Sequence, residues 1–222
     1  MTIKAFIFDM DGTAIDSMPF HAQSWVAFAK THQIGLDLPE LMRRTTGRNG
    51  HECMEVLFEC AISKPQATIL IDEKEALYRQ LFDPVFKEVG GFSSFYERAH
   101  ASNLKLGFGS AGDRHNLAFA FSRLALKHAP LSVVGGDEGF AGKPSPAIFL
   151  EVARQLGVLP SECIVFEDAP FGIEAAKAAG MRAVGITSSH TARELAGSHV
   201  LTVAADFHAL AASHFFESYL TL

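Results

Sequence analysis

Cysteine is scarce in this sequence, and histidine, although present ten times, forms no ligand pattern. The three cysteines, Cys53, Cys60 and Cys163, make an odd number and include no CxxC pair. Such a set builds neither a disulfide framework nor a zinc site, and it suits a reducing cytosol. The dispersed histidines contain no HExxH sequence. We therefore expect a cytoplasmic protein without a thiolate or imidazole metal site.

Long apolar segments and basic patches are missing as well. No apolar run approaches the roughly 20 residues that span a bilayer. Met1–Lys4 leads directly into an apolar run, without the basic region that opens a signal peptide. The 19 Lys and Arg residues are scattered along a chain of net charge −6. We therefore expect no nucleic-acid or membrane partner.

What the sequence does contain is an alternation of short apolar runs and helix-like stretches. Its 222 residues, 48% of them hydrophobic, suffice for one large domain or for a domain with an insert. Ala5–Phe8 is apolar at every position, which is typical of a strand covered on both faces. The further expected strands are 105–109, 131–134, 163–166 and 183–187, and the expected helices are 92–101, 114–125, 147–156 and 172–179. This alternation predicts an α/β fold with a doubly wound, mainly parallel sheet. A terminal strand and helix are expected after residue 188.

The interval 15–87 differs because it contains helical patterns and no convincing strand. The first helix is expected just after Ser17, with Pro19 in its first turn. Later helices are expected at 38–45, 50–60 and 66–86. We therefore predict two domains: a core domain formed by 1–14 and 88–222, and an inserted α-helical domain formed by 15–87.

Polar side chains gather where the predicted strands end. Asp9-Met10-Asp11-Gly12-Thr13 follows the first strand, Ser110-Ala111-Gly112 follows the second, and Glu167-Asp168 follows the apolar run 163–166. Gly142-Lys143-Pro144 lies in another connection. In open parallel sheets, ligands bind outside the carboxyl ends of the strands, so these segments can meet in one crevice. Each alone is also explained as a turn, a helix cap or a solvated loop.

Taken together, these segments pose an electrostatic problem. Asp9, Asp11, Glu167 and Asp168 would place four carboxylates in one cleft, which destabilises the charged forms unless a cation neutralises them. A set of oxygen ligands without His or Cys favours Mg²⁺. The hydroxyl of Ser110, the backbone N–H of Ala111 and the ammonium of Lys143 supply donors for a phosphate dianion. The set is typical of phosphoryl transfer by electrostatic positioning.

The order and placement of these segments resemble the haloacid dehalogenase-like superfamily, in the branch with a helical cap after the first strand. "DMDGT", "GSAG", "GKPSP" and "FEDAPFGIEAAKAAGM" resemble its four motifs, and the resemblance covers essentially the whole chain. It implies a Rossmann-like core with the inserted α-helical cap domain, 15–87, closing over the crevice. The presence of Asp11 favours phosphate esters over carbon–halogen or carbon–phosphorus bonds, because the leaving oxygen needs a proton donor.

The resemblance also implies a role for each matching residue. Asp9 matches the nucleophile that forms an aspartyl-phosphate, and Asp11 the general acid and base. These roles require Asp9 to be ionised and Asp11 to carry a proton. Thr13 orders the first loop, while Ser110, Ala111 and Lys143 bind the phosphate. Mg²⁺ is expected to be held by Asp9, the backbone carbonyl of Asp11, and Asp168, with Glu167 in or next to that shell.

Within the superfamily, the chain is most similar to the β-phosphoglucomutase and sugar-phosphate phosphatase group. His21 and Lys74 match two cap residues of β-phosphoglucomutase, although each is also explained as a surface residue. Mutases of the group have an arginine where "TTGRNGHE" places Gly50, and Arg48 is its nearest replacement here. A mutase must hold two phosphates in turn, so this departure favours simple hydrolysis.

Three functions therefore stay open, with a phosphatase preferred. They are an Mg²⁺-dependent phosphatase for a small phosphorylated metabolite, a phosphosugar mutase, and a non-catalytic phospho-ligand binding protein. The candidates for substrate selection in the cap are Arg43, Arg44, Arg48, Asn49 and His51, each of which is also explained as a solvated residue. A monomer is the default for this group.

Overall fold

The structure is a computed structural model that describes residues 2–219 of the chain. Its centre is a six-stranded parallel sheet in the order β3-β2-β1-β4-β5-β6. The strands are β1 (Ala5–Phe8), β2 (Lys105–Gly109), β3 (Ser132–Val134), β4 (Cys163–Glu167), β5 (Arg182–Ile186) and β6 (Val200–Ala204). The chain winds from β1 first to one edge and then to the other, so the topology switches direction between β1 and β4.

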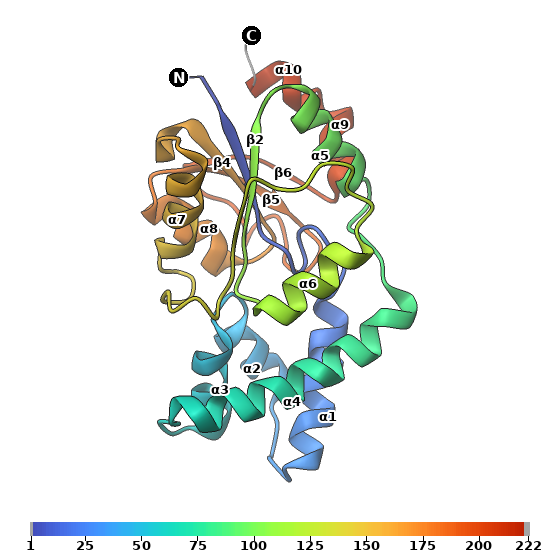
Figure 1. Ribbon diagram of the computed structural model, residues 1–222, viewed down its shortest axis with the longest axis vertical. Coiled ribbons are helices and arrows are strands. Elements are labelled where there is room, and N and C mark those ends of the chain that lie inside the picture. Colours follow the sequence, from blue (N-terminus) through green and yellow to red (C-terminus); the bar gives the residue numbers. More distant parts are fainter. Residues whose placement is uncertain (1, 220–222) are drawn as a thin grey trace.

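Helices cover both faces of this sheet (Figure 1). They are α5 (Phe92–Ala101), α6 (Arg114–Arg123), α7 (Ala147–Leu156), α8 (Pro170–Ala178), α9 (Phe207–Ala212) and α10 (Phe215–Tyr219), with the 3₁₀ turn η2 at Pro160–Glu162. Side chains alternate along each strand. Phe6 and Phe8 therefore face α5, α6, α9 and α10, whereas Ala5 and Ile7 face α7 and α8. This three-layer arrangement confirms the predicted doubly wound α/β fold.

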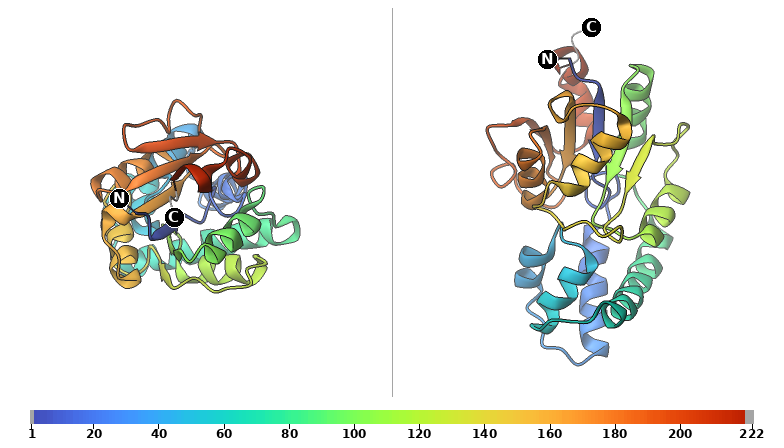
Figure 2. Two further views of the ribbon diagram at one scale, coloured as in Figure 1. Left: turned by 90° about the horizontal axis from the view of Figure 1, so that it is seen from above. Right: turned by 60° about the vertical axis from the view of Figure 1, so that its left-hand side comes forward.

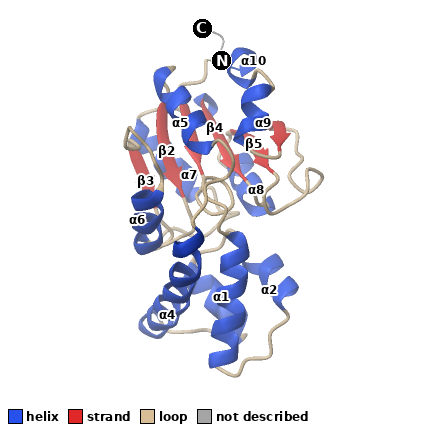
Figure 3. Cartoon of the chain, turned by 90° about the vertical axis from the view of Figure 1, so that its right-hand side faces the viewer, coloured by secondary structure: helices blue, strands red, loops and turns tan. Residues whose placement is uncertain are grey.

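The interval between β1 and α5 forms a separate group of helices beneath the carboxyl ends of the strands (Figures 2 and 3). It consists of α1 (Met18–Thr31), α2 (Leu38–Thr45), α3 (Gly50–Phe58), α4 (Lys64–Phe82) and the 3₁₀ turn η1 (Asp83–Val85). Trp25, Phe28, Met54 and Leu57 are buried in a hydrophobic core of its own. The two connections to the sheet lie side by side, since Asp16 N–H donates to the carbonyl of Lys87 over 2.9 Å.

Several element bounds differ from the sequence-based expectation by one or two residues, and two larger differences have a physical reason. Helix α4 spans Lys64–Phe82 rather than 66–86, because Pro65 fits its first turn and Pro84 cannot continue the helical hydrogen bonds. The chain after residue 188 forms β6 and then two helices, α9 and α10, where one helix was expected. The aromatic rings of Phe207 and Phe215 pack against Phe166 on the sheet, which is a long-range contact that local periodicity does not report. Among residues 2–219, no helix has the length and hydropathy needed to cross a membrane.

Candidate active site

The four predicted segments meet at the carboxyl ends of β1, β2 and β4. Phe8 pairs with Phe108 on one side and with Phe166 on the other, so the residues that follow each strand emerge at the same level. Asp9 follows β1, Ser110 follows β2, and Asp168 follows β4. Lys143 reaches this position from the connection between β3 and α7, and it is 1% exposed. The topology thus brings residues from across the chain into one crevice.

An acidic cluster forms one side of this crevice. Ligand oxygens of Asp9, Glu167 and Asp168 all lie within 4.8 Å of one another, and all three residues are buried. The Nζ atom of Lys143 donates to Asp9 Oδ1 over 2.5 Å and to Glu167 Oε1 over 2.7 Å. One ammonium thus faces three carboxyl groups, and the cluster remains net acidic.

Burial controls protonation in this cluster. It raises the pKa of Asp9 to about 7, with Lys143 opposing the rise and Glu167 adding to it. Burial and the charges of Glu167 and Asp9 also raise the pKa of Asp168. A divalent cation bound to these oxygens would favour their ionised forms. Three close, hard carboxylate ligands without His or Cys fit Mg²⁺.

The surrounding backbone leaves room for these carboxylates. Gly12 has φ +81°, and a Cβ atom there would lie 2.2 Å from Asp168 Oδ2. Gly172, in the first turn of α8, is equally restricted, because its Cβ would lie 1.8 Å from Glu167 Cδ. Thr13 is fully buried and donates its hydroxyl to Asp168 Oδ1 over 3.4 Å. These contacts explain the two glycines and the threonine in the motifs.

Ser110 and Asp11 both lie close to Gly112. A Cβ atom on Gly112 would be 3.2 Å from Ser110 Oγ and 3.4 Å from Asp11 Oδ2. Ser110 is 1% exposed, and its Oγ accepts the backbone N–H of Gly112 over 3.0 Å. The adjacent Ala111 lines the cavity that opens toward the helical insert. The predicted phosphate-binding residues thus adjoin both carboxylates of the first motif.

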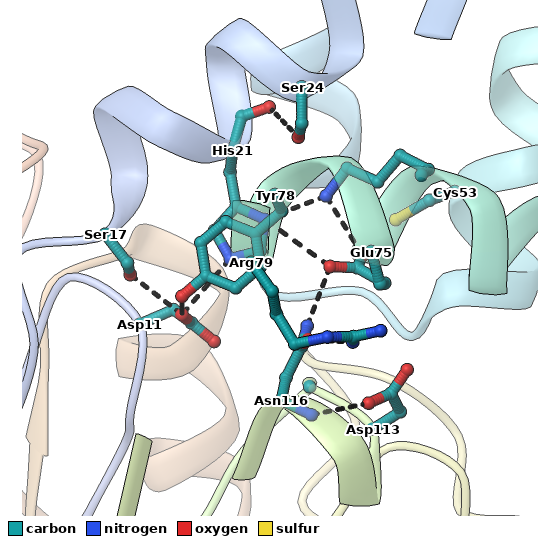
Figure 4. Close-up of polar contacts among 12 residues, drawn as sticks. Asp11, Ser17, His21, Ser24, Cys53, Glu75, Tyr78, Arg79, Asp113 and Asn116 are labelled. Atoms are coloured by element: carbon teal, nitrogen blue, oxygen red, sulfur yellow. Dashed lines mark hydrogen bonds and ion pairs between the residues drawn. The ribbon is translucent and has the colours of Figure 1, made fainter. Parts of the chain in front are cut away.

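Asp11 has different neighbours from Asp9, because the helical insert supplies them. One oxygen, Oδ1, accepts bonds from Ser17 Oγ at 2.7 Å and Tyr78 Oη at 3.2 Å, and lies 3.1 Å from His21 Nε2 (Figure 4). Burial alone would raise the pKa of Asp11, but His21, Ser17 and Lys74 outweigh it and lower the pKa to about 2. The sequence-based roles required an ionised Asp9 and a protonated Asp11. The pKa values of the two groups run in the opposite order, because burial dominates for Asp9 and contacts from the insert dominate for Asp11.

The donors around Asp11 continue into a chain of polar contacts within the insert. Lys74 Nζ lies 2.8 Å from His21 Nδ1 and donates to Glu75 Oε1 over 2.9 Å. Glu75 also accepts from Asn116 Nδ2 on α6 over 2.7 Å, and Arg79 donates to Asn116 Oδ1 over 2.7 Å (Figure 4). Lys74 is 2% exposed. The predicted residues His21 and Lys74 therefore lie at the site, and the network joins the insert to the sheet domain.

A cavity of about 580 Å³ lies between the insert and the carboxyl ends of the strands. Among the suggested selection residues, Arg48, Asn49 and His51 line it. Arg48 lies 5.5 Å from the Phe171 ring centroid and 3.9 Å from Glu52. Arg43 and Arg44 are exposed on α2 outside the cavity lining, and Arg43 pairs with Glu40. The structure thus places Arg43 and Arg44 toward solvent rather than in the cavity wall.

Several residues of the site were not identified from the sequence. They are Ser17, Glu75, Asn116 and Ser189, and Tyr78 was noted only for its spacing from Lys74. Four of the five act across the boundary between the insert and the sheet domain, and Ser189 bonds to Asp168 from the loop after β5. Such contacts depend on how distant segments pack. The available signal was helical spacing, which places residues 71, 74, 75 and 78 on one side of α4.

Comparison with known proteins assigns the family. The model of the haloacid dehalogenase-like hydrolases matches residues 3–180, and the chain belongs to that family. The chain is 32% identical over 199 residues to validoxylamine A 7'-phosphate phosphatase from Streptomyces hygroscopicus subsp. limoneus, covering 89% of this chain and 92% of the relative. It is 32% identical over 183 residues to fructose-1-phosphate phosphatase YqaB from Escherichia coli, and the match covers 81% of this chain and 94% of the relative.

A solved structure extends the likeness to three dimensions. The crystal structure of beta-phosphoglucomutase from Clostridium difficile superposes with a TM-score of 0.85 at 26% identity, covering 98% of this chain and 97% of the other. The resemblance to the capped phosphatase and phosphoglucomutase group is thereby confirmed.

Proposed function

We propose that this protein is an Mg²⁺-dependent phosphatase that hydrolyses a small phosphate ester, a sugar phosphate in the first instance, through an aspartyl-phosphate. The observation that carries the proposal is the buried cluster of Asp9, Lys143, Glu167 and Asp168, together with Asp11, which lines the cavity. The names of the phosphatase relatives support the reaction class. We further propose that 1–14 and 88–222 act as the core domain and 15–87 as the cap domain.

In the first step, an oxygen of Asp9 attacks phosphorus while the bond to the leaving oxygen breaks. Asp11 donates a proton to that oxygen, and then takes a proton from the water that attacks the aspartyl-phosphate. Water attack releases inorganic phosphate and restores the Asp9 carboxylate. Ser110, the N–H of Ala111 and Lys143 hold the phosphoryl oxygens, while Thr13 keeps Asp168 in place.

Asp9, the carbonyl of Asp11, and Asp168 would hold Mg²⁺, which would offset the negative charge of the phosphoryl group. Both oxygens of Glu167 already accept bonds, from Lys143 Nζ and from the N–H of Ala169. This arrangement favours Glu167 next to the metal shell. Because a phosphate dianion adds negative charge beside Asp11, it raises the pKa of Asp11, as the proton donor needs.

The cap favours hydrolysis over a mutase reaction. Gly50 occupies the position at which mutases carry an arginine, and its Cβ would lie 3.1–3.2 Å from three carbons of Ile71. A long side chain at position 50 therefore meets α4. Arg48 lines the cavity two residues before that position, 5.5 Å from the Phe171 ring centroid and 3.9 Å from Glu52. A phosphosugar mutase remains the second candidate because the beta-phosphoglucomutase structure superposes well.

The test is a phosphate-release screen over small phosphate esters with and without Mg²⁺. Wild-type protein should release phosphate only with Mg²⁺, and Asp9→Asn should abolish release. Asp72→Asn is the matched control, because Asp72 is an exposed aspartate on α4. Unchanged hydrolysis by Asp9→Asn would remove Asp9 as the nucleophile. Glucose 6-phosphate formed from β-glucose 1-phosphate without phosphate release would favour the mutase.

A further inference from the structure

The connection between α2 and α3 of the proposed cap contacts the loop that carries Lys143 (Figure 1). The carbonyl of Gly47 accepts the backbone N–H of Lys143 over 3.1 Å. Oε1 of Glu52, on α3, accepts the backbone N–H of Gly142 over 3.1 Å, although the two residues are 90 positions apart in the sequence. Two consecutive amides of the sheet domain thus donate to the cap. Both bonds exist only while the cap lies against the sheet domain.

The packing around these two bonds is close. A Cβ atom on Gly142 would lie 2.5 Å from Glu52 Oε2 and 2.8 Å from the backbone nitrogen of Asn49. Gly47 has φ +90°, and a Cβ atom there would lie 3.5 Å from Lys143 Cβ. The cap therefore packs against both the backbone and the side-chain stem of Lys143, at positions where only glycine leaves enough room.

This contact acts on the position of Lys143. The Nζ atom of Lys143 donates to Asp9 Oδ1 and Glu167 Oε1, and the proposed phosphate site depends on it. A bonded backbone fixes the point from which the side chain extends. A displacement of about 1 Å in a reacting group can lower a rate about 100-fold. Bonds to the Gly142 and Lys143 amides therefore bear on catalysis from outside the phosphate site.

We infer that Glu52 is a positioning residue, which fixes Lys143 through the backbone of Gly142 when the cap closes. Together with the carbonyl of Gly47, it completes the phosphate site only in the closed form. Opening of the cap leaves both amides to water and loosens the backbone of Lys143. This inference rests on the proposed phosphatase activity and adds a residue through which cap closure reaches the phosphate site.

Two substitutions of Glu52 separate its two contacts. Its carboxylate accepts the N–H of Gly142 and also lies 3.9 Å from Arg48 Nη1. Glu52→Gln keeps an oxygen for the Gly142 N–H but removes the charge beside Arg48, whereas Glu52→Ala removes both. With Mg²⁺, Glu52→Ala should lower kcat/KM at least about tenfold, while Glu52→Gln should stay within about threefold of the wild type.

The loss should follow the phosphoryl group rather than the leaving alcohol, because Lys143 holds phosphoryl oxygens. In Glu52→Ala, kcat/KM should therefore fall by the same factor for p-nitrophenyl phosphate and for the best sugar phosphate of the screen. The affinity for inorganic phosphate, measured by isothermal titration calorimetry with Mg²⁺, should also fall about tenfold. Glu55→Ala is the control, because Glu55 lies on the same helix and accepts the N–H of Ile62 within the cap over 3.4 Å. It should leave all three values unchanged.

Gly142→Ala reaches the same bond from the sheet domain. Its methyl group would collide with Glu52 and Asn49. Phosphate affinity should therefore fall as in Glu52→Ala, while the helices of the cap are left intact. This variant tests the inference independently of any effect of Glu52→Ala on the folding of α3.

The possible results separate the two proposals. Equal losses in Glu52→Gln and Glu52→Ala overturn the inference, because they assign the effect to the charge beside Arg48. A loss confined to one ester also overturns it, since Glu52 would then act on the alcohol, and so does unchanged phosphate affinity in Glu52→Ala and Gly142→Ala. Absence of phosphate release from every ester by the wild type contradicts the phosphatase. Calorimetry with inorganic phosphate then still decides whether Glu52 positions Lys143.

Discussion

At the scale of single residues, Lys74 is held by the cap more tightly than its position on a helix suggests. It is almost fully buried, contacts His21 and Glu75, and lies 4.8 Å from the ring centroid of Trp25. A buried ammonium is stable only when partners compensate for its lost hydration. Lys74 therefore connects Asp11, through His21, to the structure of the cap.

Replacing Lys74 alone should destabilise the protein strongly. Lys74→Met leaves Glu75 buried without its cation, and we expect the free energy of unfolding to fall by about 3–5 kcal/mol. Lys74→Met combined with Glu75→Gln should recover most of this loss, because no unpaired charge remains. Chemical denaturation at pH 7 measures both. The exposed ion pair between Arg43 and Glu40 offers a control, since Arg43→Met should change the free energy of unfolding little. Equal losses in the single and double variants would show that charge pairing is not the cause.

A second residue-scale prediction concerns Ser189. Its hydroxyl donates to Asp168 Oδ2, the oxygen opposite the one bonded by Thr13. Hydrogen bonds to a ligating carboxylate fix its orientation, and their loss commonly weakens metal binding about 10–100-fold. Ser189→Ala should therefore bind Mg²⁺ at least about tenfold more weakly in isothermal titration calorimetry.

The control for Ser189 lies in the same loop. Thr191 bonds to Glu194 rather than to Asp168, so Thr191→Ala should bind Mg²⁺ like the wild type. Unchanged Mg²⁺ affinity in Ser189→Ala would show that Thr13 alone suffices to orient Asp168.

At the scale of elements, the start of α8 is shaped by a side chain from β4. Glu167 lies over Gly172, where a Cβ atom would lie 1.8 Å from Glu167 Cδ. Ala favours helices by about 1 kcal/mol over Gly. Here the collision should dominate, because Glu167 must rotate and lose its bond to Lys143.

We therefore expect Gly172→Ala to lower the free energy of unfolding by about 1.5–3 kcal/mol, the contribution of a hydrogen bond to a charged group. The rate of phosphate release should fall as well, since Lys143 loses its bond to Glu167. Gly35→Ala is the control, because no atom lies within 4 Å of a Cβ placed there. Denaturation and phosphate release on both variants check the prediction, and a Gly172→Ala protein with wild-type stability and activity would refute it.

At the scale of the whole molecule, local sequence patterns predicted most of the helices and strands. They predicted few of the contacts between the cap and the sheet domain. The continuous apolar run Ala5–Phe8 is buried on both faces and revealed the central strand. The strand-end motifs predicted that Asp9 and Asp168 lie together, because parallel topology brings the ends of β1 and β4 to one edge, whereas Lys143 arrives from the connection between β3 and α7. The bonds of Asp11 to Tyr78, and of Glu75 to Asn116, span 67 and 41 residues. They depend on how the cap packs onto the core, which periodicity does not encode.

Glu75 makes this docking dependent on pH. Burial would raise its pKa, but Lys74, His21 and Asn116 outweigh burial and lower the pKa below its ordinary value of 4.5. The folded protein therefore holds the Glu75 proton less tightly than the unfolded chain does. Its contribution to stability is present above pH 4.5 and is lost as the pH falls through the lower, folded-state value.

Glu75→Gln removes this contribution, so the variant should be less stable than the wild type at pH 7. The difference should shrink steadily as the pH falls below 4.5, because protonation removes the same charge from the wild type. Chemical denaturation of both proteins from pH 7 down to acid measures the difference. Glu59→Gln, at an exposed position, should track the wild type throughout. A constant difference between Glu75→Gln and the wild type across this range would mean that Glu75 stabilises the interface through shape and neutral hydrogen bonding. A shrinking difference assigns the effect to the charge of Glu75, and thereby to its ion pair with Lys74, which contacts Asp11 through His21.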